Sequence, residues 1–269
     1  DRLDWYRNII VPTSYMCLGS QDDFFGGYDH DQQAGFVHWA DHRVAPGKKQ
    51  WTWGNSPFGW AWDANLTDTD GPYVELMAGV FTDNQPDFSF LAPGETKTFS
   101  QFWYPIRQIG PAHQATLDAA VRLDVTPGDR ETDVRVAVGV TSTRAGLEIR
   151  LVDQQGRVVW ICTADAGPGD PFVQQVHLAD RFAPTELTLV AMHAGRELVR
   201  WQHRPIPEQL EVPDPATEPP APCDISTVEE LYLTGLHLEQ YRHATRSPEP
   251  YLLEALARDP QDIRSNVAQ

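Results

Sequence analysis

The feature that most constrains the fold is a series of short segments in which apolar and polar residues alternate. Between residues 115 and 204 these include "TDVRVAVGVTS", "LEIRLVDQQGRVVWICTA" and "TELTLVAMHAGRELVRWQH". A period of two places successive side chains on opposite faces of a β-strand. The stretches "DQQGRV" and "HAGREL" are typical of hairpin connections. Five to seven strands within about ninety residues predict a small β-sandwich over residues 115–204.

Residues 1–110 also consist of short apolar runs, but here the runs are rich in aromatic residues. Glycine pairs and turn signals interrupt them in "FFGGYDHDQQ", "APGKK", "TDTDGP" and "LAPGET". Frequent turns between short runs predict an all-β region. Seven of the nine tryptophans lie in this region: Trp5, Trp39, Trp51, Trp53, Trp60, Trp62 and Trp103.

The last part of the chain has a different texture. Residues 205–224 are rich in proline and acidic residues, which predicts an extended, semi-rigid linker. Residues 225–269 carry helical signals, beginning with a capping box formed by Ser226 and Glu229. A second helix is predicted to begin at Ser247-Pro248 and to end at Pro260.

Composition excludes several classes of function. The chain has 21 Lys and Arg against 38 Asp and Glu, a formal net charge of -17. Such a surface repels phosphate backbones and anionic lipid, and no apolar run is long enough to cross a bilayer, so we expect neither nucleic acid nor membrane as partner. Cys17, Cys162 and Cys223 are odd in number and lack metal-binding spacing. This favours a reducing, cytoplasmic compartment and argues against a disulfide scaffold or a zinc site. We expect no bound metal and no cofactor.

One strand within the aromatic region carries a carboxylate at its centre. In "GPYVELMAGVFTDNQPDF", residues 71–88, counting by twos separates two faces. The apolar face consists of Val74, Leu76, Ala78 and Val80, and the other of Tyr73, Glu75, Met77 and Gly79. The second face fits either a half-exposed strand with a salt-bridged glutamate or the floor of a ligand cleft.

The surrounding residues favour a sugar-binding cleft, because indoles stack on sugar rings while polar groups take the hydroxyls. Alternation predicts that Trp51 and Trp53 share one strand face, and that Trp60 and Trp62 share another. The alternative is a tryptophan-rich core. His38 and His42 are expected on one strand face about 13 Å apart, too far to ligate one metal. The oxygen-rich run Asp63, Asn65, Asp68 and Asp70 fits a solvated turn better than a calcium loop.

The segments "FFGGYDHDQQAGFVHWADH", "PGKKQWTWGNSPFG", "DGPYVELMAG" and "DNQPDFSFLAPGETKTFSQFWYPI" resemble a family of bacterial domains of unknown function. Members of that family precede tetratricopeptide repeats and have the galactose-mutarotase-like supersandwich fold. The resemblance implies a mainly β chain in which residues 1–110 are the C-terminal part of a supersandwich. The sandwich over 115–204 follows, and residues 225–269, with "EALARDP", resemble the start of tetratricopeptide repeats. The alternative for those helices is a plain hairpin.

The same resemblance implies roles for two carboxylates. Within "VELMAG…N…LAPGET" Glu75 takes the place of the general base, and within "GGYDH" Asp29 takes that of a ligand for sugar hydroxyls. The acid histidine and a substrate-binding arginine of mutarotases come from an earlier half that would precede Asp1, so we expect the chain to be a piece of a longer protein. His38 or His42 could replace the missing acid. A glycosidase would instead pair Glu75 with Asp29, Asp41 or Asp63.

These patterns predict a carbohydrate-active domain. Glu75 is the expected catalytic residue of an epimerase-like isomerase or a glycoside hydrolase. The expected saccharide-binding residues are Asp29, His38, His42, Trp51, Trp53 and Tyr73. The alternatives are a non-catalytic glycan-binding module and a structural platform for the repeats. The helical segment is expected to bind a protein partner, because stacked helix pairs present concave surfaces.

Overall fold

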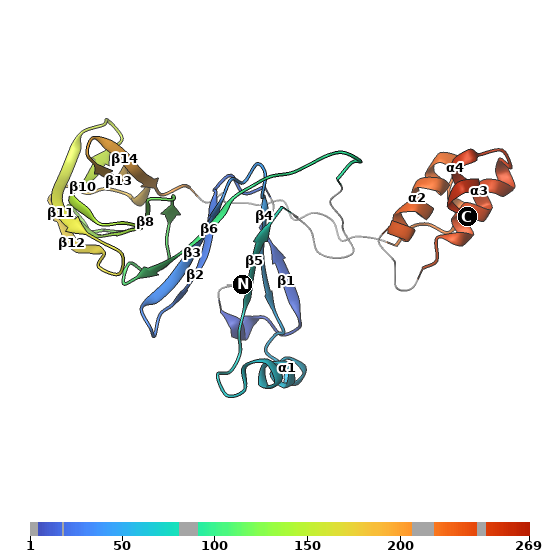
Figure 1. The fold of residues 1–269 in the computed structure, drawn as a ribbon, viewed down its shortest axis with the longest axis horizontal. Helices are drawn as coiled ribbons and strands as arrows, with labels where there is room; N and C mark the ends of the chain where they lie inside the picture. Colours follow the sequence, from blue (N-terminus) through green and yellow to red (C-terminus); the bar gives the residue numbers. More distant parts are fainter. Residues whose placement is uncertain (1–4, 18, 81–90, 206–217, 241–245) are drawn as a thin grey trace. The chain divides into compact units, whose positions relative to one another are not determined.

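The structure, a computed structural model, describes residues 5–17, 19–80, 91–205, 218–240 and 246–269 (Figure 1). The chain divides into two compact units. The first comprises residues 1–82 and 93–206, and the second comprises residues 83–92 and 207–269. The first unit is built from antiparallel sheets and the second from helices, so the chain is mainly β as its patterns predict.

The aromatic region forms two three-stranded antiparallel sheets. One sheet has the strand order β1-β4-β5 and the other β2-β3-β6. The bounds are β1 Thr13–Met16, β2 Phe24–Asp29, β3 Ala34–Ala40, β4 Gly47–Thr52, β5 Glu75–Gly79 and β6 Gln101–Arg107. A short 3-10 helix, η1 (Tyr6–Asn8), precedes them, and the helix α1 (Pro57–Thr67) connects β4 to β5.

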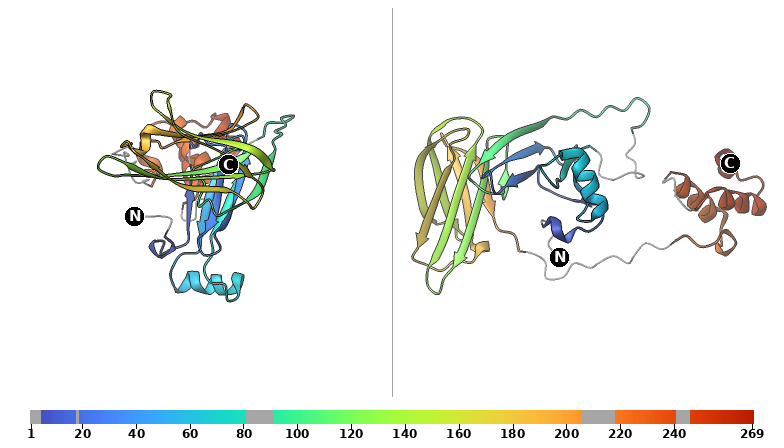
Figure 2. Two further views of the ribbon diagram at one scale, coloured as in Figure 1. Left: turned by 90° about the vertical axis from the view of Figure 1, so that its left-hand side faces the viewer. Right: turned by 90° about the horizontal axis from the view of Figure 1, so that it is seen from below.

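The alternating segments form two four-stranded antiparallel sheets, which Figure 2 shows facing each other. Their strand orders are β12-β9-β8-β7 and β11-β10-β13-β14. The bounds are β7 Gln114–Ala115, β8 Ala119–Pro127, β9 Thr132–Val140, β10 Arg144–Asp153, β11 Val158–Ala166, β12 Phe172–Leu178, β13 Leu187–His193 and β14 Arg196–Gln202, with a 3-10 turn η2 at Pro184–Glu186. The predicted sandwich and both predicted hairpins are confirmed.

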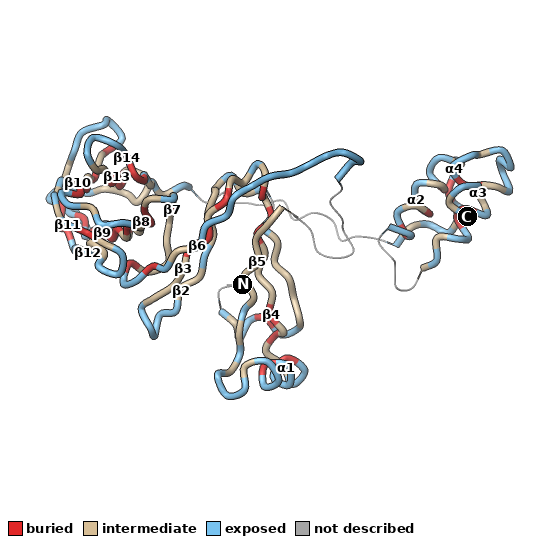
Figure 3. Tube along the Cα trace, viewed as in Figure 1, coloured by how far each residue is buried: buried red, intermediate tan, exposed pale blue. Residues whose placement is uncertain are grey.

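A single apolar core fills the space between these two sheets. Leu123 and Val136 come from one sheet and Ile149, Leu151 and Leu189 from the other, and all five are fully buried. The alternation of each strand produces this core, because every second residue turns inward. Buried positions are dense on these strands in Figure 3 and sparser on the smaller sheets.

A second apolar cluster joins the β2-β3-β6 sheet to the outer face of the sandwich. Val37 and Ile106 come from the small sheet, and Ala120 and Ala137 come from β8 and β9. Ile109 comes from the connection between β6 and β7. Ile109 is fully buried. The aromatic region and the sandwich therefore share buried surface within one compact unit.

The two small sheets enclose a more polar interior. A side chain at Gly27 would meet Leu76 Cδ1 at 2.9 Å, so Leu76 of β5 lies against β2. His38 of β3 and Lys48 of β4 are buried, as is Thr52. The expected apolar face of β5 is only partly realised, because Val74 is 48 % exposed. Residues 81–90, the remainder of that segment, lie outside the described residues.

The helix α1 corrects the prediction that Trp60 and Trp62 occupy a strand face, since both lie on this helix. Ser56 stands at its N-cap in an extended conformation and Pro57 opens the first turn, where a missing N–H costs nothing. Two glycines allow the backbone before α1 to pack closely against the first turn of the helix. Gly54 has φ +85°, and any side chain at Gly59 would collide with the Gly54 carbonyl.

The second unit contains helices α2 (Val228–Gln240), α3 (Glu249–Arg258) and α4 (Ile263–Ala268), preceded by a 3-10 turn η3 at Pro222–Asp224. The first two helices confirm the predicted pair. The capping prediction is wrong by one residue: Thr227, rather than Ser226, caps α2, its hydroxyl accepting from the Glu230 amide at 3.1 Å. The linker residues 206–217 lie outside the described part of the chain.

Close packing holds α2 and α3 together. A side-chain carbon at Gly235 would approach Leu252 Cδ2 to 3.0 Å, so α2 presents its smallest residue to α3. Leu231, Leu238 and Tyr251 are buried in the same cluster. Among the described residues, every helix falls short of the length and apolar character that a bilayer-crossing segment needs.

Candidate functional site

Four of the predicted site residues meet on the outer face of the β1-β4-β5 sheet. Trp51 of β4 is directly opposite Glu75 of β5 in the strand pairing. The Trp53 indole N–H donates to the Tyr73 hydroxyl oxygen at 3.1 Å, and that hydroxyl donates to Glu75 Oε1 at 2.9 Å. Trp51 and Trp53 meet edge to face, their ring centroids 5.3 Å apart. The structure thus brings together Trp51, Trp53, Tyr73 and Glu75 as a hydrogen-bonded aromatic group.

The helix α1 extends this group with further rings. Trp62 stacks on Trp53, with centroids 4.5 Å apart and planes 10° from parallel, and Phe58 lies against the same indole. Trp62 remains 39 % exposed. The Trp60 indole is held by a 2.9 Å bond to Asn55 Oδ1 while its ring faces solvent. Helix and sheet together present an aromatic surface that sequence alternation could not assemble.

The Tyr73 hydroxyl sets the hydrogen bonding of Glu75. Burial, followed by the hydrogen bond to Glu75, raises the pKa of Tyr73, while the Trp53 N–H opposes the shift. Tyr73 therefore keeps its proton and donates it to the carboxylate. One Glu75 oxygen is used in this way, and the other has no partner among the described residues, which leaves it for a ligand.

The helix α1, which carries Trp62, also carries a buried carboxylate. Asp63 of α1 is 4 % exposed, and its Oδ2 accepts a 2.9 Å hydrogen bond from Tyr6. Burial and this bond raise the pKa of Tyr6 to about 12. The Tyr6 hydroxyl also lies 2.8 Å from the Gly54 carbonyl oxygen, so the N-terminal segment anchors the start of α1. The bond to Tyr6 gives Asp63 a structural role. The oxygen-rich run that begins with Asp63 is divided between α1 and the turn that follows it.

His38 belongs to the β2-β3-β6 sheet and lies on the inner side of the β1-β4-β5 sheet, opposite to the outer side that carries Glu75. It shares a strand face with Phe36, which lies beside Gly27 and therefore on the side of Leu76. Because Leu76 and Glu75 are consecutive, their side chains point to opposite faces. His38 is 2 % exposed, its Nε2 is 3.0 Å from Gln101 Oε1, and burial lowers its pKa. A neutral histidine in this position cannot serve as the acid partner of Glu75.

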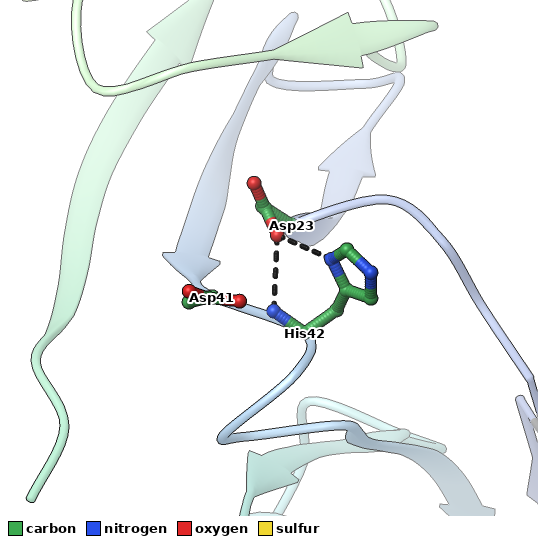
Figure 4. A group of neighbouring side chains, drawn as sticks. All are labelled: Asp23, Asp41 and His42. Atoms are coloured by element: carbon green, nitrogen blue, oxygen red, sulfur yellow. Dashed lines mark hydrogen bonds and ion pairs between the residues drawn. The ribbon is translucent and has the colours of Figure 1, made fainter.

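His42 corrects a second geometric expectation. It lies beyond the end of β3, in the following turn, so it does not share a strand face with His38. Figure 4 shows it with Asp23 and Asp41. Asp23 Oδ1 accepts from the His42 ring Nδ1 at 2.7 Å and from the His42 amide at 3.0 Å.

The same three residues offer ligand atoms that all lie within 4.8 Å of one another. A cation bound there would have to replace the hydrogen bond between Asp23 and His42. Asp41 is also engaged, because its Oδ1 accepts from the Arg43 amide at 2.9 Å. These bonds give the group a sufficient role in fixing the turn after β3.

Asp29 lies at the far end of β2, about 20 Å from Asp23 by the strand rise. Its Oδ1 accepts from the amides of Asp31 and Gln32 at 2.8 and 3.0 Å, which closes the β2–β3 hairpin. Asp29 is exposed. Among the described residues, the hydrogen bonds of Asp29, His38 and His42 go to partners outside the group around Glu75.

Comparisons with known families match the two parts of the first unit separately. Residues 2–106 match the family described as "Domain of unknown function (DUF5107)". Residues 114–201 match the family described as "YphG-like protein, second domain". No solved structure matches the chain. The matches agree with the resemblance to a bacterial domain of unknown function, and they meet between β6 and β7.

Proposed function

We propose that residues 5–107 bind a saccharide on the outer face of the β1-β4-β5 sheet, including α1. The observation that carries this proposal is the hydrogen-bonded series from Trp53 through Tyr73 to Glu75 beside exposed indoles. Sugar rings present an apolar C–H face and a rim of hydroxyls. An indole face beside a fixed carboxylate oxygen complements both.

Recognition is better supported than catalysis. Opening a sugar ring requires a base and an acid, and hydrolysis requires two carboxyl groups flanking the glycosidic bond. Glu75 supplies one such group. Among the described residues, His38 faces the opposite side of the sheet and Asp63 is buried against Tyr6. We therefore propose saccharide binding first, and isomerase or hydrolase chemistry at Glu75 as the second candidate.

The finer fold assignment belongs to the same proposal. The paired small sheets would be the C-terminal part of a galactose-mutarotase-like supersandwich, and the three helices the start of tetratricopeptide repeats that bind a protein partner. The close approach of α2 and α3 at Gly235 supports the helical part. Exposed Ile263 and Val267, four residues apart on α4, support an apolar docking face.

The test is calorimetric titration of the full chain with neutral oligosaccharides, with proton NMR of the same mixtures to detect product release or anomeric exchange. Trp62→Ala removes an exposed ring, and we expect about tenfold weaker binding. Glu75→Gln removes the charged acceptor and should weaken binding by a similar factor. Turnover that disappears in Glu75→Gln would establish the second candidate.

Matched controls are available on other surfaces. Trp103→Ala removes an indole that is 53 % exposed on β6, and Glu230→Gln removes an exposed carboxylate of α2. Both should leave binding unchanged. Equal weakening by Trp103→Ala and Trp62→Ala, or the absence of any binding to the wild type, would refute the proposed surface.

A further inference from the structure

A cleft of about 350 Å³ lies where the aromatic region meets the edge of the sandwich. It is separate from the outer face of the β1-β4-β5 sheet. One wall consists of Gln21, Asp22, Asp23 and Trp39, and the other of residues 114–116 and 197–200. Trp39 shares its strand face with Val37, which packs against the sandwich. Neither family match alone contains both walls.

The cleft is fixed by contacts that cross the junction. Arg204 donates to both carboxylate oxygens of Asp22, at 2.8 and 3.1 Å, and Gln114 donates to one of them at 3.4 Å. From β4, the buried Lys48 ammonium donates to Ser20 Oγ at 2.9 Å and to the Asp22 carbonyl oxygen. A loop held from both sides forms a binding wall before a ligand arrives, which lowers the entropic cost of binding.

Most charges that line the cleft are already paired. Arg204 satisfies Asp22 and lowers its pKa, so that carboxylate stays ionised, and Arg200 satisfies Glu197. Asp23 uses Oδ1 for His42, while its Oδ2 has no partner among the described residues. The cleft therefore offers an indole, paired ions and an acceptor oxygen, and its three carboxylates disfavour an anion.

We propose that this cleft is a second saccharide-binding site, which takes an uncharged sugar unit on Trp39 with a hydroxyl donating to Asp23. An indole at the junction of two domains, beside a carboxylate oxygen that has no partner among the described residues, has the composition of such sites. The site does not depend on the proposed surface around Glu75. It requires both β-domains, because its walls come from each.

The test is two-dimensional ¹H–¹⁵N NMR of the indole N–H groups of the full chain, whose nine tryptophans give nine signals. Trp39→Phe and Trp62→Phe assign the signals of the two sites. Glucose, galactose, mannose, maltose, cellobiose and lactose are titrated, with glucuronate as the anionic match. We expect a saturable shift of the Trp39 signal by a neutral sugar, and none by glucuronate.

Asp23→Asn keeps the shape of the side chain and its bond to His42. It should weaken the affinity reported by Trp39 about tenfold. A Trp39 signal that no neutral sugar moves overturns the inference, and so does a shift that Asp23→Asn leaves unchanged. Shifts at Trp62 alone overturn it while supporting the surface around Glu75. Shifts at Trp39 alone support the cleft and refute that surface.

Discussion

The two β-regions of the first unit use their buried space differently. The sandwich encloses an apolar core drawn from both sheets, with eighteen buried hydrophobic residues in one cluster. The aromatic region buries His38, Lys48, Thr52 and Asp63, and it leaves large rings such as Trp60 and Trp62 exposed. Interiors that hold ionisable groups cost stability, and exposed rings cost solubility. The contrast indicates that the sandwich supplies stability, while the aromatic region carries the surfaces proposed above for binding.

The largest expected effect comes from the same substitution made once in each region. Leu151→Ala removes a fully buried side chain of the sandwich and should lower the free energy of unfolding by about 2–5 kcal/mol. Leu66→Ala, on the exposed side of α1, should change it by less than about 0.5 kcal/mol. Urea denaturation followed by circular dichroism measures both. Equal losses would remove the distinction between the two regions.

A second pair compares backbone strain at two glycines. Gly54 and Gly156 both have positive φ, +85° and +78°. A side chain at Gly54 would meet the Val11 backbone at 2.6 Å, whereas Gly156 faces open space. Gly54→Ala should therefore lower the free energy of unfolding by roughly 1–3 kcal/mol, and Gly156→Ala by about 1 kcal/mol or less. The same denaturation assay measures both losses of unfolding free energy. A greater loss for Gly156→Ala than for Gly54→Ala would contradict the prediction.

The smallest expected effect is the loss of folding stability at acidic pH. Burial, aided by Arg122 and His203, lowers the pKa of His113 to about 4. Below the ordinary histidine value of 6.5 the unfolded chain takes up a proton that the folded chain does not, so stability falls as pH decreases toward 4. From pH 7 to pH 5 we expect a loss of roughly 1 kcal/mol after solvent screening. His113→Gln should flatten this part of the curve.

His177 provides a control of opposite sign. It is exposed on β12, and the hydrogen bond that its ring donates to Asp133, with help from Glu131, raises its pKa. Its contribution is present below the ordinary histidine value and is lost as pH rises through the raised one. His177→Gln should therefore reduce stability at acidic rather than neutral pH. A pH profile that His113→Gln does not alter would show that His113 is not the acid-sensitive group.

The sequence predicted the sandwich well because strict alternation and short hairpin turns are local signals. It failed at α1, where tryptophans spaced two apart suggested a strand, although Ser56 followed by Pro57 is a helix-start signal that was present. The group of Trp51, Trp53, Tyr73 and Glu75 was predictable from strand parity. The stacking of Trp62 was not, and neither was the junction cleft, since Asp22 and Arg204 are 182 residues apart in the chain.

The apolar cluster around Ile109 has a consequence for how such a chain can change over evolutionary time. Two families meet within a few residues of this position, which suggests freely exchangeable modules. Yet Ile109, with Val37 and Ile106 on one side and Ala120 and Ala137 on the other, forms a shared seam. Exchange of either neighbour for an unrelated domain would expose that seam to water. The boundary drawn along the sequence is therefore not a boundary in packing.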